Sequence, residues 1–123
     1  MNRICVLIIT VLLIVLFCGC ANQVFDGSST GNDEQFILSY SVLNCEKTHQ
    51  MTLDEGSVIS VSINNGKGRI DVMVVGSQGR VLYKGDDADN NEFKLTVQQS
   101  DTYTFSVTGK NAKNGNISFI VNK

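Results

Sequence analysis

Hydrophobic and polar residues follow two different patterns along this chain of 123 residues. Residues 4–17 form an almost unbroken apolar run, whereas from residue 36 onward apolar and polar residues alternate. A period of two places successive side chains on opposite faces of a strand, so the alternation predicts strands with one buried face. No convincing helical period occurs in this second part. The pattern therefore predicts an all-β domain over residues 36–123.

The alternation divides this domain into about eight short strands, separated by turns rich in Gly, Asn and Asp. Because Asn-Gly tolerates the positive φ of primed turns, residues 64–68 are expected to form a tight hairpin. Short strands at even spacing predict an antiparallel β-sandwich of jelly-roll or immunoglobulin-like Greek-key type, with a small barrel as the alternative. A weaker strand is expected over residues 47–53, and the core residues of the other strands are Phe36, Leu38, Tyr40, Val42, Ile59, Val61, Ile63, Ile70, Val72, Val74, Val81, Tyr83, Phe93, Leu95, Val97, Tyr103, Phe105, Val107, Ile117, Phe119 and Val121.

The N-terminal apolar run ends at a short motif that contains a cysteine. Arg3 precedes the run, whose length fits a secretory signal peptide and falls short of the ~20 residues that span a bilayer. The motif Phe17-Cys18-Gly19-Cys20 resembles the lipobox of bacterial lipoproteins, which is Leu, a small residue, Gly or Ala, then Cys. Gly19 and Cys20 match this pattern, whereas Phe17 and Cys18 depart from it. The resemblance implies cleavage before Cys20 and a diacylglyceryl thioether on its sulfur, with acyl chains such as palmitate.

Three segments follow from this interpretation. Residues 1–19 are a signal-peptide helix, residues 20–35 are the lipidated cysteine with a flexible tether, and residues 36–123 are the sandwich. The tether is expected because residues 21–35 are polar, rich in Gly, Ser and Asn, and without periodicity. The mature protein would then be attached by its lipid to the extracytoplasmic face of the cell membrane.

The second half of the chain carries four segments of a recognisable pattern: residues 68–75, 79–83, 101–109 and 115–119. They resemble the pre-peptidase C-terminal type of bacterial β-sandwich and small lipoproteins of Firmicutes with no assigned role. Thr102 stands where that family has Gly before the tyrosine. Because those domains are accessory modules, the resemblance implies a binding or structural role in a Gram-positive cell. A Gram-negative host is the alternative.

Cysteines and charge narrow the interpretation further. Of the four cysteines, Cys5 and Cys18 would leave with the signal peptide and Cys20 would carry lipid, so Cys45 has no partner for a disulfide. Two alternatives remain for Cys45, a buried small hydrophobe or a reactive thiol, and the absence of a basic cluster around it favours the first. The net charge of −2 and the lack of any basic run argue against nucleic acid as a partner.

No pattern in the sequence predicts an enzyme. His49 is the only histidine, and there is no Gly-x-Ser-x-Gly, His-Glu-x-x-His or Cys-x-x-Cys motif. A small hydrolase or an enzyme-accessory domain at the cell surface is the rival hypothesis. A carbohydrate-binding module is a further alternative, although the chain has no Trp to form a stacking platform.

The acidic loop at residues 85–92 is the only dense cluster of oxygen ligands. Calcium takes six to eight oxygens, and Asp86, Asp87, Asp89 and Asn91 could supply several of them. The spacing of an EF-hand is missing, however, and Asp and Asn are also common in solvated turns. No other metal and no cofactor is predicted.

Several apolar residues fall on the outward phase of the expected strands. Met73, Val75, Leu82 and Ile120 would form a patch for a protein partner or a homodimer if they shared one face, with Ile37 and Leu43 beside them. The alternative is that they face a loop or the second layer. The loops at residues 85–91 and 109–116 are the other expected binding edges.

Overall fold

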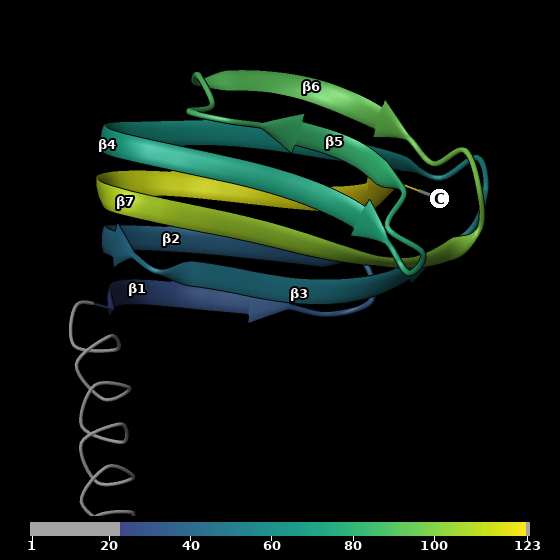
Figure 1. Cartoon of the computed structure of the whole chain (residues 1–123), viewed down its shortest axis with the longest axis horizontal. Coiled ribbons are helices and arrows are strands. Elements are labelled where there is room, and N and C mark those ends of the chain that lie inside the picture. The colour runs from purple at the N-terminus through teal and green to yellow at the C-terminus, as the bar shows by residue number, and fades with distance from the viewer. Residues whose placement is uncertain (1–22, 123) are drawn as a thin grey trace, which may run out of the picture.

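The computed structural model describes residues 23–122, and this part of the chain forms seven antiparallel strands and no helix. The all-β prediction is therefore confirmed, and none of the described residues belongs to a helix that could cross a membrane. In chain order the strands are β1 (Val24–Gly31), β2 (Gln35–Asn44), β3 (Glu46–Leu53), β4 (Val58–Gly76), β5 (Val81–Gly85), β6 (Asn91–Thr96) and β7 (Asp101–Asn122) (Figure 1).

Two long strands build both layers of the sandwich. β4 and β7 pair with each other along almost their whole length, from Val58 opposite Asn122 to Gly76 opposite Tyr103. Both strands bend at the left edge of Figure 1 and return in the other layer. The first layer has the order β1-β2-β7-β4-β6, and the second has β3-β7-β4-β5. Four of the short strands expected from the sequence are thus halves of two long ones.

The bend of β4 corrects the hairpin expected at residues 64–68. The two halves of β4 pair with β7 instead of with each other, and the register shifts between Lys67 and Arg69. Gly68 has a φ of 79°, a conformation that favours glycine, and a side chain there would collide with the backbone of Asn111. The Asn-Gly signal therefore marks a corner, where two paired strands turn together from one layer to the other.

The core lies between the layers and follows the predicted alternation in most strands. Phe119 is central to it, because its ring lies 5.1 Å from that of Phe105 and 6.0 Å from that of Phe36. The buried hydrophobic residues are Phe36, Leu38, Tyr40, Leu43, Met51, Leu53, Ile59, Val61, Ile63, Ile70, Val72, Val74, Val97, Tyr103, Phe105, Val107, Ala112, Ile117, Phe119 and Val121. This list contains most of the residues predicted to face inward.

Irregular register explains two positions where the predicted face is wrong. β2 skips Ser41 in its pairing with β1, so Leu43 enters the core with 0% exposure while Val42 is only half-buried. The register between β4 and β5 also shifts, and Val81 is 53% exposed. An extra residue in one strand sends the side chains that follow it to the opposite face of the sheet. The alternation of apolar and polar residues alone does not reveal where such a residue is inserted.

Strand β1 corrects the expected tether at residues 20–35. Val24–Gly31 pairs with β2, although all of its side chains except that of Phe25 are exposed. An edge strand of this kind is held by backbone hydrogen bonds on one side and needs no alternating apolar residues, so its sequence resembled a linker. The signal peptide expected at residues 1–19 and the lipid attachment site Cys20 lie outside the described residues.

Candidate binding groove and neighbouring surfaces

A groove of about 440 Å³ crosses the outer face of the first layer. Three strands contribute outward-facing side chains to it, and these are Ser60 and Ser62 from β4, Ser118 and Ile120 from β7, and Glu92 and Lys94 from β6. The hollow follows from residue size, because the central strands carry serines where longer side chains would fill the space.

The strand register gives the groove a floor and two walls. Ser62 lies opposite Glu92 on one side and Ser118 on the other, while Ser60 lies between Lys94 and Ile120. The three serines are therefore the floor, with a charged wall on β6 and an apolar wall at Ile120, which is 40% exposed. The side chain of Asn122 donates a hydrogen bond to the Ser60 hydroxyl at 3.0 Å.

The groove offers hydrogen-bond donors and acceptors, both signs of charge and one apolar contact. Phe93 also lines the groove, but it alternates with Glu92 and Lys94 along β6 and packs against the core, with its ring 4.9 Å from that of Tyr83. It is therefore not a flat platform for stacking a sugar ring. The chemistry of the groove suits a polar chain that can exchange hydrogen bonds with hydroxyl groups.

A second, smaller groove of about 290 Å³ lies on the outer face of the second layer. It is more acidic, since its lining includes Glu46, Asp71 and Asp86, together with Lys84, Met73, Ser106 and Thr108. It adjoins the corner where β4 and β7 bend.

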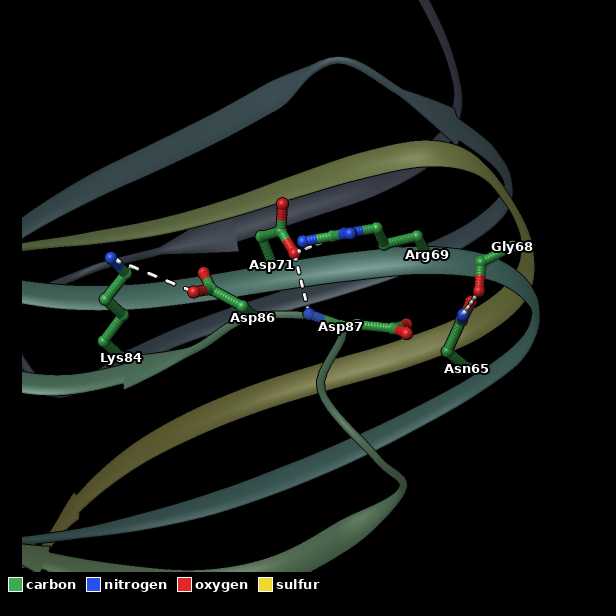
Figure 2. Close-up of polar contacts among 7 residues, drawn as sticks. All are labelled: Asn65, Gly68, Arg69, Asp71, Lys84, Asp86 and Asp87. Carbon is green, nitrogen blue, oxygen red and sulfur yellow. Dashed lines mark hydrogen bonds and ion pairs between the residues drawn. The ribbon is translucent and has the colours of Figure 1, made fainter.

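Asp71 is the centre of the polar contacts beside this second groove (Figure 2). One oxygen of its carboxylate, Oδ1, accepts a hydrogen bond from the backbone N–H of Asp87 at 2.8 Å and from Nε of Arg69 at 2.9 Å. The bond from Asp87, with the Arg69 charge, lowers the pKa of Asp71, and the same contact with Asp71 raises the pKa of Arg69. Asp71 thus holds the acidic loop against β4.

Two of the four candidate calcium ligands in the acidic loop make contacts within the domain. Asp86 lies 3.9 Å from the Lys84 ammonium, and Asp87 adopts a φ of 50° as its N–H turns toward Asp71. Within residues 23–122 no group of three or more Asp, Glu, His or Cys side chains is placed to hold a metal ion.

The expected apolar patch is divided between separate surfaces. Met73 and Val75 face outward on the second layer, where Met73 lines the smaller groove, whereas Ile120 lines the groove of the first layer. Leu82 packs against the core. The hypothesis of one shared patch is therefore wrong, because the bend in β4 and β7 sends their two halves to different faces.

The side chains of His49 and Cys45 both make contacts within the folded domain. Nε2 of His49 lies 2.7 Å from the backbone oxygen of Asn32, and its ring lies 5.4 Å from that of Phe36. Cys45 is a half-buried free thiol that packs against the core. His49 therefore connects the β1–β2 turn to β3.

Sequence reasoning missed the groove of the first layer. The available signal was the pair of serines at outward positions 60 and 62, with a third at 118. Recognising the groove also requires knowing that β4 lies between β6 and β7, and alternation carries no information about strand neighbours.

Comparison with known proteins relates this chain to others by fold alone. No family model and no curated protein matches it. A crystal structure of Aeromonas hydrophila PliG, a periplasmic inhibitor of g-type lysozyme, is similar with a TM-score of 0.51 and 13% identity, covering 78% of this chain and 88% of that one. A CBM4 structure is similar with a TM-score of 0.42 and 14% identity, covering 77% of this chain and 73% of that one.

Proposed function

We propose that this protein is a non-catalytic binding module at the extracytoplasmic face of the cell membrane. It is held there by the lipid on Cys20 and binds an extended segment of a protein partner in the groove of the first layer. The observation that carries the proposal is the groove itself, with a serine floor between the charged wall of Glu92 and Lys94 and the apolar wall of Ile120.

The chemistry of the groove favours a peptide over a sugar. A peptide presents amide groups that bond to Ser60, Ser62 and Ser118, and side chains that can meet Ile120 or the charges on β6. A sugar would lack a stacking platform, because the aromatic residue in the lining, Phe93, packs against the core and Tyr83. The similarity in fold to an inhibitor whose target is a protein supports the same preference.

The surroundings of the sole histidine support a non-catalytic role. His49 lies next to the Asn32 carbonyl and the Phe36 ring, in a position that fastens a turn. A hydrolase that used His49 as a general base would require a nucleophilic hydroxyl or thiol within hydrogen-bond reach of its ring.

Filling the groove tests the proposal. Ser62→Trp places a large side chain on the groove floor, while Thr48→Trp places the same side chain on an exposed position of β3 in the second layer. Tagged full-length chains are cross-linked in intact cells and purified. We expect wild type and Thr48→Trp to capture the same protein partner, and Ser62→Trp to capture at least tenfold less, a loss of about 1.4 kcal/mol.

Equal capture by all three chains would contradict the assignment of the groove. Purified g-type lysozyme is the first defined partner to test, because the PliG structure is that of an inhibitor of this enzyme. Turnover of a chromogenic ester by the purified protein would instead support the rival hydrolase.

A further inference from the structure

The corner where β4 and β7 bend carries two pairs of facing basic residues. Lys67 on β4 lies directly opposite Lys113 on β7, and Arg69 lies directly opposite Lys110. All four residues are exposed, in a chain whose net charge is −2. Like charges directly opposite each other in a sheet are destabilising, so two such pairs at one corner call for a compensating interaction.

Only part of this charge is compensated within the domain. Arg69 pairs with Asp71, and the charges of Asp87 and Asp86 in the acidic loop raise its pKa further. Lys110 lies near enough to Asp71 to lower the pKa of that carboxyl. Lys67 and Lys113 differ, because among the described residues no carboxylate lies within ion-pair distance of either ammonium. The tip of the corner thus presents two unneutralised lysines side by side.

The chain enters the domain at the same corner. Val24, the first residue of β1, pairs with Asn44, whose side-chain oxygen accepts a hydrogen bond from the backbone N–H of Asn111 at 3.0 Å. Figure 1 shows β1 beginning at the edge where β4 and β7 bend. Cys20 precedes Val24 by four residues, which span at most about 14 Å when fully extended.

We propose that this corner lies against the anionic lipid headgroups of the membrane, with Lys67 and Lys113 contacting their phosphates. The inference rests on the lipid anchor at Cys20, which would hold the corner within reach of the headgroups. Each basic residue near an anionic surface strengthens association about fivefold, so the anchor and the corner act as two signals.

The orientation has a consequence for the groove. The loops at residues 32–34, 54–57, 77–80 and 97–100 lie at the opposite end of the strands and point away from the bilayer. The groove on the outer face of the first layer then stands upright beside the membrane, open to a partner approaching along its surface.

The lipidated mature protein in vesicles tests this orientation. Flotation on phosphatidylcholine vesicles reports the lipid anchor, and amide hydrogen exchange in vesicles with or without phosphatidylglycerol reports contact at the corner. We expect flotation on both vesicles. Exchange at residues 64–69 and 109–115 should slow several-fold only with phosphatidylglycerol. High salt should remove this slowing, and the exchange rate of residues 97–100 should not change.

Charge-reversal variants identify which residues cause the slowing of exchange at the corner. Lys67→Glu with Lys113→Glu should abolish the slowing, and the milder Lys67→Gln with Lys113→Gln should reduce it. Arg80→Glu, in the loop at the opposite end of the strands, is the control for Lys67→Glu alone. It makes the same change in net charge and should retain the slowing of exchange. Melting temperatures of all variants confirm that each is folded.

The two hypotheses fail in different ways. Absence of flotation on neutral vesicles contradicts the anchor on which the inference rests. Flotation with equal corner exchange on both vesicles overturns the inference while the anchor stands. Slowing of the same size with inorganic phosphate alone would show a free-anion site and would also overturn the membrane assignment.

Discussion

Gly68 and Gly79 have almost the same backbone conformation but very different surroundings. Their φ values are 79° and 80°, in the left-handed region where side chains are strained. A Cβ on Gly79 would meet nothing within 4 Å, whereas a Cβ on Gly68 would collide with the backbone of Asn111 and Ala112. Because these backbone atoms belong to β7, which pairs with β4 at the corner, they cannot move without disturbing this pairing.

Alanine at these two glycines separates conformational strain from steric collision. We expect Gly79→Ala to lower the free energy of unfolding by about 1 kcal/mol, the cost of the left-handed conformation alone. Gly68→Ala should cost at least about 2 kcal/mol more, because the corner must also shift. Thermal unfolding measures both variants, and equal melting temperatures would contradict the close contact at the corner.

Asp101 gives the stability of the domain a defined dependence on pH. Its carboxylate accepts hydrogen bonds from the Ser77 hydroxyl at 2.6 Å, the Thr102 N–H at 2.7 Å and the Ser77 N–H at 3.0 Å. The Ser77 hydroxyl is the largest of the influences that lower the pKa of Asp101 below its ordinary value of 3.8. The stabilisation is therefore fully present above that value and is lost as pH falls through the lower pKa of the folded state.

Asp101→Asn removes this dependence on pH. We expect the difference in melting temperature between wild type and the variant to be largest near neutral pH and to shrink below pH 3.8. Asp71, whose pKa is also lowered, remains in both proteins and leaves part of the acid sensitivity in place. A difference that stays constant across the acid range would contradict the role of the charged carboxylate.

At the scale of elements, strand β1 is fastened at two points to the opposite layer. The Lys47 ammonium on β3 lies 4.3 Å from the centre of the Phe25 ring on β1. His49, also on β3, contacts the Asn32 carbonyl in the turn that follows β1. These contacts close the edge of the sandwich between β1 and β3, so β1 belongs to the folded domain although few of its side chains are buried.

Removing the ring should loosen β1 without unfolding the rest. Phe25→Ala loses the cation–π contact and the packing of a half-buried ring, so we expect a loss of about 1–2 kcal/mol. Val24→Ala, at a position 49% exposed, should change stability by less than about 0.5 kcal/mol. Hydrogen exchange should accelerate in residues 24–31 of the Phe25 variant only, and uniform acceleration across the core would argue against this account.

The contrast between β1 and β7 shows which elements the sequence could predict. In β7 the alternation of Tyr103, Phe105 and Val107, and later Ile117, Phe119 and Val121, correctly predicted the buried face. β1 was mistaken for a tether because its stability comes from backbone pairing with β2, which leaves no side-chain pattern. The register shifts at Ser41 and near Val81 likewise leave no trace in the alternation of apolar and polar residues.

The candidate site was less predictable than the fold, for a topological reason. Ser60 and Ser118 are far apart in sequence and become neighbours only because β4 pairs with the second half of β7. The same bend separates Met73 from Ile120, which the sequence had placed in one patch. Residue periodicity predicts which face of a strand is outward, but only strand order determines which outward residues meet.

At the scale of the whole molecule, the ordered β1 changes how the domain would be held at a membrane. Only residues 21–23 separate the proposed lipid attachment site Cys20 from the first strand, in place of the fifteen-residue tether that the sequence suggests. The bilayer would then lie close to the corner formed by residues 64–69 and 109–115, and the groove would have a restricted orientation.

The identity of the first residue of the mature protein tests the account most directly, because location and orientation both depend on it. The chain is expressed at its natural level and purified from the membrane fraction, and its N-terminal peptide is analysed by mass spectrometry. We predict a peptide that begins at Cys20 and carries a diacylglyceryl group on sulfur, and a Cys20→Ala variant that is unprocessed or released from the membrane. A mature chain that begins elsewhere, or that retains Cys20 as a free thiol, would contradict the account.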